Sequence, residues 1–156
     1  MYNPFYENQR GFGGQRGMFG MPQEADAAII NDVIEAIILE VFAYNFYENL
    51  AELAPTDYER DVINSIQQDE ARHYHWFTMI LQRLGGNLPE IPTGVLPTDF
   101  MEGLKIAIQD ELNAASFYQN IAYNAVDHQM QMHFMHASHD EQRHASWLQY
   151  ILTNMR

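Results

Sequence analysis

The residues best suited to chemistry lie in the sequence Asp-Glu-x-Arg-His, which occurs twice in the chain, 71 positions apart. In each copy a glutamate and a histidine are three residues apart, Glu70 with His73 and Glu141 with His144. Residues at this spacing share one face of a helix, so each copy offers a carboxylate and an imidazole side by side. One such pair is typical of an ordinary helix surface. Its repetition points instead to a duplicated metal site, because both groups are common metal ligands.

The repeat extends into the segment before each copy. The same shift of 71 positions places Glu40 on Glu111 and Tyr47 on Tyr118. Each of these glutamates stands 30 residues before the glutamate of its Asp-Glu-x-Arg-His copy. Equivalent core positions in the two halves would explain why aliphatic residues match. They do not explain why a glutamate recurs within the apolar face of each helix. The repeating unit is therefore interpreted as a helical hairpin, and two hairpins imply an internal pseudo-twofold axis.

Four helices must position these residues. Apolar side chains recur every three or four residues, as one face of a helix requires. Pro55 and the glycine pair 85–86 interrupt this pattern, and Thr56 with Glu59 has capping-box spacing for the start of a helix. Asp99 with Glu102 suggests a further start. The predicted helices cover about 24–53, 56–84, 99–125 and 127 to the C-terminus.

The connections between the helices set the topology. Two are short, which makes antiparallel hairpins. The middle one contains three prolines and, extended at about 3.3 Å per residue, can run the length of a helix of about 40 Å. It is therefore predicted to join two parallel-running neighbours, the second and third helices. The expected fold is an all-α antiparallel four-helix bundle over 24–156, with repeat halves 24–84 and 99–156. Residues 1–23, rich in glycine and aromatic residues, are predicted to form a flexible tail.

The two hairpins bring their acidic residues to one level. Glu40 and Glu70 lie 15 residues on either side of Pro55, so they come level on antiparallel helices with equal rise. Glu111 and Glu141 are related in the same way by the second turn. Four carboxylates in one bundle would be very unfavourable without compensation. Two divalent cations would balance them, and a carboxylate–imidazole ligand set without thiolate suits iron or manganese, with zinc still open.

The composition argues against several other classes. The formal charge of −13 disfavours a nucleic-acid partner, because phosphate binding needs a basic surface. The chain has no cysteine, which excludes disulfides, thiolate metal sites and thiol catalysis. Acidic residues interrupt the most apolar stretch, so no membrane span is expected. No signal peptide is visible, and a cytoplasmic location is expected. The tail loosely resembles those of spore-associated bacterial proteins.

At this point the chain resembles the ferritin-like superfamily, nearest to its rubrerythrin-type and bacterioferritin-type di-iron domains. The resemblance covers about residues 24–156 and rests on EVFAYNFY with DEARH and on ELNAASFY with DEQRH. It implies one terminal pair of ligands per metal and two bridging glutamates. The implied pairs are Glu40 with His73 and Glu111 with His144, and the implied bridges are Glu70 and Glu141.

The resemblance also implies roles around the metals. Asp69 and Asp140 match acids that orient the ligating histidines. Tyr47 and Tyr118 match tyrosines that hydrogen-bond near the metals, although core packing explains them equally well. His133 lies three turns from His144 and is either a relay or transient metal site or a histidine at the core edge.

The activity implied is that of a di-iron oxidoreductase with two iron ions per chain, manganese being an alternative. It would oxidise Fe(II), reduce hydrogen peroxide or dioxygen, draw on an external electron donor and form a homo-oligomer, a dimer or larger. The chain departs from rubrerythrins in lacking a cysteine-bearing electron-transfer domain. It also lacks their extra glutamate on the third helix, where Ile108 and Ala114 stand.

Other functions stay open at this level. A di-manganese centre could dismutate peroxide with the same ligands. The protein could instead be a structural or assembly component tethered through residues 1–23. A third reading is a bundle that has kept the residues without binding metal.

Overall fold

The computed structural model describes residues 22–155, and all four predicted helices are present. In chain order they are α1 (Pro22–Glu52), α2 (Asp57–Arg83), α3 (Phe100–Tyr123) and α4 (His128–Asn154). No strand occurs within residues 22–155, and the all-α fold class is confirmed. Among these residues, no helix combines the length and apolar composition that crossing a membrane requires. The predicted tail lies outside the described residues, except for its last two positions, which begin α1.

Helix starts follow local side-chain signals, with one correction. Asp99 accepts a hydrogen bond from the backbone N–H of Glu102 at 2.8 Å, which satisfies a free donor of the first turn of α3. Thr56 is the N-cap of α2, so the predicted helix start is confirmed, but the capping box does not form. The Thr56 side chain makes no cap bond and donates instead to the Glu59 carboxylate. The hydroxyl has turned to the carboxylate, so this contact replaces the bonds to backbone N–H groups.

The glycine pair ends α2 as predicted. Gly85 has a φ of +78°, a left-handed conformation that glycine adopts without steric cost. The N–H of Gly86 donates to the Leu81 carbonyl at 2.9 Å, and the N–H of Gly85 donates to the Gln82 carbonyl at 3.1 Å. Together these bonds form a Schellman motif, which satisfies the last carbonyls of α2 and turns the chain into the long link.

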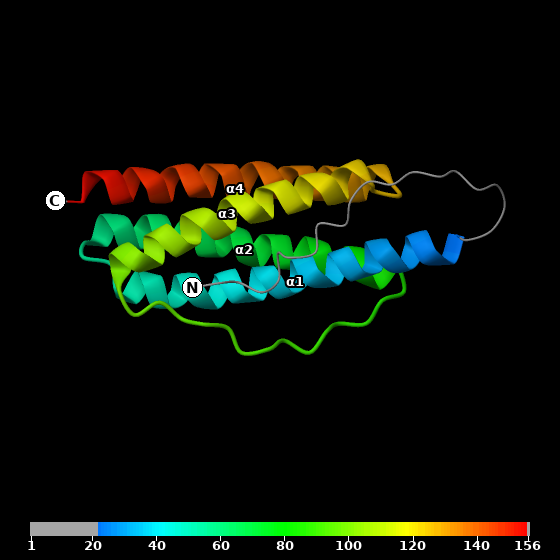
Figure 1. Cartoon of the computed structure of the whole chain (residues 1–156), viewed down its shortest axis with the longest axis horizontal. Coiled ribbons are helices and arrows are strands. Elements are labelled where there is room, and N and C mark those ends of the chain that lie inside the picture. The colour runs from blue at the N-terminus through cyan, green and yellow to red at the C-terminus, as the bar shows by residue number, and fades with distance from the viewer. Residues whose placement is uncertain (1–21, 156) are drawn as a thin grey trace.

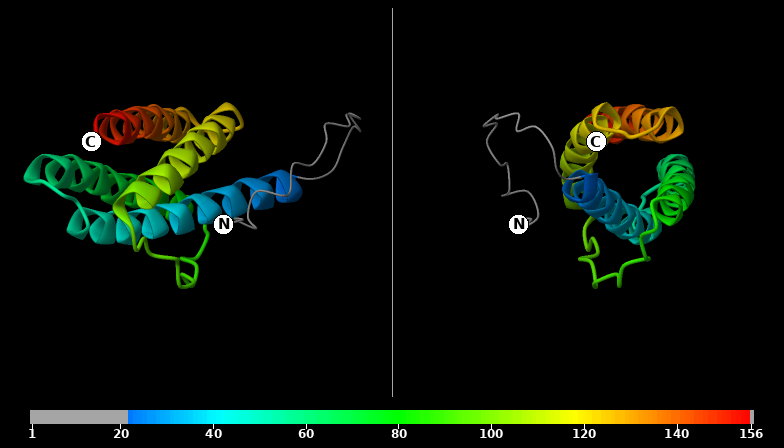
Figure 2. Two further views of the ribbon diagram at one scale, coloured as in Figure 1. Left: turned by 60° about the vertical axis from the view of Figure 1, so that its left-hand side comes forward. Right: turned by 90° about the vertical axis from the view of Figure 1, so that its right-hand side faces the viewer.

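The two hairpins, α1 with α2 and α3 with α4, pack against each other to form the bundle (Figure 1). The link between α2 and α3 runs from one end of the bundle to the other (Figure 1), and it lies on the outside of the bundle (Figure 2). A Cβ added at Gly94 in this link would lie 3.2 Å from the ring of Phe42 on α1. The link therefore packs closely on that helix.

The relation between α2 and α3 differs from the prediction. They run in the same direction, but within the described residues α2 packs on α1 and α4, and α3 packs on α4 and α1. The two parallel helices therefore lie on a diagonal of the bundle and are not neighbours. Every adjacent pair is antiparallel, an arrangement that the link permits because it passes around α1.

The core is divided by a polar layer. One apolar cluster fills one end of the bundle and includes Ile37, Phe77 and Phe134. A second fills the other end and includes Leu50, Leu104 and Leu148. Between them, each of the four helices contributes at least one buried glutamate. Apolar packing on both sides therefore fixes the position of this layer and shields it from water.

Candidate metal centre

Six buried side chains meet in the polar layer. They are the six that the sequence pattern and the resemblance single out, and each is at most 5% exposed. Their ligand atoms form two groups, and within each group the atoms lie within 4.8 Å of one another. Glu70 and Glu141 belong to both groups, the first being completed by Glu40 and His73 and the second by Glu111 and His144.

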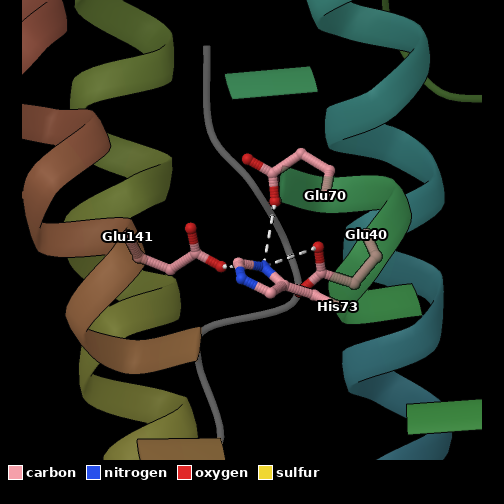
Figure 3. A group of neighbouring side chains, drawn as sticks. All are labelled: Glu40, Glu70, His73 and Glu141. Carbon is pink, nitrogen blue, oxygen red and sulfur yellow. Dashed lines mark ion pairs between the residues drawn. The ribbon is translucent and has the colours of Figure 1, made fainter. Parts of the chain in front are cut away.

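The first group gathers around Nδ1 of His73, as Figure 3 shows. This nitrogen lies 3.2 Å from Glu141 Oε1, 3.5 Å from Glu70 Oε2 and 3.6 Å from Glu40 Oε2. Three helices therefore aim a carboxylate at one edge of one imidazole ring: α1, α2 and α4.

The second group repeats the arrangement around Nδ1 of His144. This nitrogen lies 2.8 Å from Glu141 Oε2, 3.1 Å from Glu70 Oε1 and 3.5 Å from Glu111 Oε2. Each shared glutamate thus directs one oxygen to each histidine. The pseudo-twofold axis inferred from the repeat passes between the two groups.

The opposite nitrogen of each histidine faces an aspartate from the other hairpin. Nε2 of His73 lies 3.0 Å from Asp140 Oδ2, and Nε2 of His144 lies 3.0 Å from Asp69 Oδ2. An aspartate in this position fixes the ring so that Nε2 carries the proton and Nδ1 points into the cluster. Both aspartates therefore contact a histidine, each across the boundary between the hairpins, while their role in orienting metal ligands stays a prediction.

The two tyrosines make a second crossed pair. Tyr118 donates a hydrogen bond to Glu40 Oε1 at 2.5 Å, and Tyr47 donates one to Glu111 Oε1. Both rings are also buried in the two apolar clusters. Each tyrosine therefore packs in the core and at the same time holds a buried glutamate of the opposite hairpin.

Polar atoms without partners mark the space between these groups. Among the side chains of residues 27–155, six buried atoms have no hydrogen-bond partner, and one of them is Thr78 Oγ1. The other five belong to the cluster and are Nδ1 of His73, Nδ1 of His144, Glu40 Oε2, Glu70 Oε1 and Glu141 Oε2. An unpartnered buried polar atom is costly. Because all five are metal-ligand types aimed at one another, the residues present fit a pair of metal ions.

The charges of the cluster are strongly coupled. Burial, reinforced by the Glu70 carboxylate, raises the pKa of Glu40 well above its usual range. Burial and the Glu141 carboxylate do the same to the pKa of Glu111. Burial also disfavours the charged form of Glu70, but its close approach to both histidine rings outweighs burial and lowers the pKa of Glu70 to about 2.

The surroundings of both histidines favour the protonated ring. Burial would lower the pKa of His73, but Glu40 and a hydrogen bond to Asp140 raise it well above its usual range. For His144 the main opposing contact is the hydrogen bond to Asp69, with the same result. The positive imidazolium rings then balance part of the carboxylate charge. Metal ions would take over that balance and displace the protons.

Other residues near the cluster have different positions. His133 is half-buried and belongs to neither ligand group; its ring packs on Trp76 at 4.8 Å between centroids. Arg72 and Arg143 contact both orienting aspartates. No role for these arginines was predicted, although their presence in both copies of the repeat was a visible signal.

No protein-family model matches the chain. The chain is 33% identical over 136 residues to the uncharacterized protein YhjR of Bacillus subtilis (strain 168), covering 86% of this chain and 93% of YhjR. The fold is shared with the bacterioferritin of Desulfovibrio desulfuricans, whose structure contains a di-iron site. That comparison gives a TM-score of 0.75 at 21% identity and covers 86% of this chain and 84% of the other.

A second solved structure with this fold is the bacterioferritin-related protein of Bacteroides fragilis, a dodecameric thioferritin. It matches with a TM-score of 0.74 at 21% identity and covers 83% of this chain and 86% of its own. A hypothetical protein of Pyrococcus furiosus matches with a TM-score of 0.72 at 19% identity. The match covers 86% of this chain and 95% of the other. These solved structures show that the chain has the fold of bacterioferritin, and its identity to YhjR shows that it belongs to the same family as that protein.

Proposed function

We propose that the protein is a dinuclear metal oxidoreductase that holds two iron ions and uses them to oxidise Fe(II) and reduce hydrogen peroxide or dioxygen. The observation that carries this proposal is the set of five unpartnered nitrogen and oxygen atoms that face one another in the buried layer. A protein interior without such a function would not keep them, because apolar side chains of similar size would be more stable there.

The ligand assignment follows the two groups. Glu40 and His73 would hold one ion, Glu111 and His144 the other, and two glutamates would bridge both. Four carboxylates balance the four positive charges of two divalent cations, while each histidine binds as a neutral ring. Oxygen and imidazole donors suit iron and manganese. A pair of ferrous ions bound here would supply two electrons, one from each ion, to peroxide or dioxygen.

The chain's own residues provide the setting for this chemistry. The two apolar clusters exclude bulk water from both sides of the layer. Asp69 and Asp140 keep the Nε2 protons in place and the Nδ1 atoms free for metal. Tyr47 and Tyr118 hold a hydroxyl proton at one oxygen of each terminal glutamate, which leaves the second oxygen for a ligand bond. Re-reduction for repeated turnover needs an external electron donor.

Self-association is part of the proposal. The Bacteroides fragilis relative in fold is dodecameric, which supports a homo-oligomer here too. The alternative of an assembly protein rests on residues 1–23, of which all but the last two lie outside the described residues.

The same donor set also fits two manganese ions, which is the di-manganese alternative. Protein loaded with Mn(II) would then release dioxygen from hydrogen peroxide. Iron-loaded protein would instead consume peroxide as its ferrous ions are oxidised.

The activity test uses protein loaded anaerobically with Fe(II) and mixed with hydrogen peroxide or with dissolved dioxygen, while ferric absorbance is followed. The proposal predicts oxidation well above that of free Fe(II), and its loss in Glu70→Gln. Glu48→Gln, an exposed position on α1, serves as the matched control and should react like the wild type. Full activity in Glu70→Gln would contradict the proposed site.

A further inference from the structure

Arg72 and Arg143 lie outside the proposed ligand set, yet both contact the aspartates that face the two histidines. Arg72 contacts Asp69 through Nη1 at 2.7 Å and Asp140 through Nη2 at 3.0 Å. Arg143 contacts Asp140 through Nη1 at 2.6 Å and Asp69 through Nη2 at 2.8 Å. The four side chains therefore form a closed arginine–aspartate ring between α2 and α4, in which each arginine bridges the same two aspartates.

The ring engages every oxygen of its aspartates. Asp69 presents Oδ1 to Arg72, and it presents Oδ2 to both Arg143 and His144. Asp140 presents Oδ1 to Arg143, and it presents Oδ2 to both Arg72 and His73. A carboxylate held at both oxygens cannot rotate without breaking an ion pair. The arginines therefore fix the direction from which each aspartate contacts its histidine.

Stability alone does not explain this arrangement. The arginine side chains are 43% and 51% exposed, and ion pairs as exposed as this contribute little to folding. The aspartates are more deeply placed, at 15% and 8% exposed, and stand directly between the arginines and the histidines. Groups that hydrogen-bond to a metal-ligating histidine set its orientation, and losing one costs about 10–100-fold in metal affinity.

Arg72 has an additional support. Its guanidinium carbon lies 5.4 Å from the ring centroid of Trp76, within the range of a cation–π contact. The Trp76 ring in turn lies 5.5 Å from the ring of His73. The equivalent tryptophan of the other hairpin, Trp147, is 43% exposed and packs edge-on against Tyr150. The arginine–aspartate ring is therefore held more firmly at Arg72 than at Arg143.

We propose that Arg72 and Arg143 are positioning residues that orient both histidines jointly, so that the loss of either arginine weakens both metal positions. This inference rests on the proposed dinuclear site and adds a set of residues to it. Because each arginine touches both aspartates, and each aspartate serves the histidine of the opposite hairpin, neither arginine acts on one metal position alone.

The test measures metal binding without relying on activity. Metal-free full-length protein is titrated with Co(II), whose visible absorption reports both stoichiometry and ligand geometry. The variants are Arg72→Lys and Arg143→Lys, which keep the charge but cannot bridge two carboxylates in a fixed fork. Arg72→Gln also removes the charge. Arg60→Lys is the matched control, because Arg60 pairs with Asp57 at the same spacing on the same helix, away from the site.

The inference predicts that both Co(II) ions bind about tenfold or more weakly in each lysine variant, with an altered absorption spectrum. The control should bind like the wild type. If charge rather than orientation mattered, the lysine variants would bind normally and only Arg72→Gln would change, which would overturn the inference. Weakening of only one of the two ions would overturn it as well.

A thermal melt of the metal-free proteins tests whether Arg72 only stabilises the fold. The inference expects Arg72→Lys and Arg60→Lys to melt at similar temperatures, and a large loss of stability confined to Arg72→Lys would overturn it. Wild-type protein that binds no Co(II) would contradict the dinuclear site itself. Wild-type protein that binds two ions, with unchanged lysine variants, would contradict only the role of the arginines.

Discussion

Tyr118 on α3 donates a hydrogen bond at 2.5 Å to Glu40 on α1, across the boundary between the two hairpins. Tyr47 and Glu111 make the reciprocal contact. Glu40 and Glu111 are therefore each held by a residue of the opposite hairpin. The two halves of the repeat together form the buried cluster, because each of its two groups includes a glutamate from the opposite hairpin.

Removing the Tyr118 hydroxyl should destabilise the protein. In Tyr118→Phe, Glu40 Oε1 loses its donor while remaining buried, which costs about 1–3 kcal/mol for a hydrogen bond to a group of this kind. Urea unfolding of the metal-free protein measures the change. Tyr123→Phe on the same helix removes the hydroxyl of a side chain that is 68% exposed and should have little effect. Equal stability of the two variants would contradict the importance of the crossed bond.

The crossed aspartate contacts give a second prediction. The substitution Asp69→Asn in α2 should disturb the ring of His144 in α4, which Asp69 contacts. It should affect the ring of His73 less, because that ring contacts Asp140. Nitrogen chemical shifts of the histidine rings, recorded by NMR with and without Zn(II), report this directly. Metal affinity should fall about tenfold or more. A change confined to the histidine of the same helix would show that the hairpins are not linked in this way.

Metal binding should depend on pH. Contacts with carboxylates raise the pKa of both histidines, so their contribution to metal-free stability is complete below about 6.5, the unfolded value, and is lost as the pH rises through the folded value. The raised pKa values of Glu40 and Glu111 act in the same direction. Metal displaces these protons, so the stabilisation by metal should increase with pH.

Melting curves with and without Mn(II) between about pH 6 and pH 8 test whether metal stabilises the protein more at higher pH. The difference in melting temperature between the two forms should widen as the pH rises. Calorimetric titration in buffers of different ionisation enthalpy should also show proton release on binding. A difference that narrows with rising pH would contradict the protonation assigned to the cluster.

Trp76 should report on the site by its fluorescence. Its ring lies 5.5 Å from that of His73, whereas Trp147 lies near Tyr150. Co(II) binding should therefore quench Trp76 more strongly, because quenching by a paramagnetic ion weakens with distance. Trp147→Phe isolates the responsive tryptophan and Trp76→Phe the less responsive one. Equal quenching in the two variants would place the metal elsewhere.

Much of this structure could be predicted because its signals are local or repeated. Helix lengths follow from the spacing of apolar residues, and the ends at Asp99 and Gly85 follow from the conformations that these residues favour. The six cluster residues could be found because a shift of 71 positions superimposes them in pairs. Counting residues from Pro55 was then enough to bring the glutamates to one level.

The remaining features depend on how the helices rotate and pack. A periodic pattern says which face of a helix is buried but not which helix covers it. For this reason α2 and α3 were expected to be neighbours, although they lie on a diagonal. The partners of Asp69 and Tyr47 on the opposite hairpin could not be predicted for the same reason. The arginine–aspartate ring exists only once the two copies face each other.

The most direct test of the dinuclear site counts the metal ions that one chain holds. Full-length protein is loaded anaerobically with Fe(II), freed of excess iron and assayed for iron per chain. The wild type and Glu48→Gln should retain about two ions, in keeping with the two ligand groups. The double variant Glu70→Gln with Glu141→Gln, which lacks both shared carboxylates, should retain almost none. A wild type without iron, or a double variant that still holds two ions, would contradict the site.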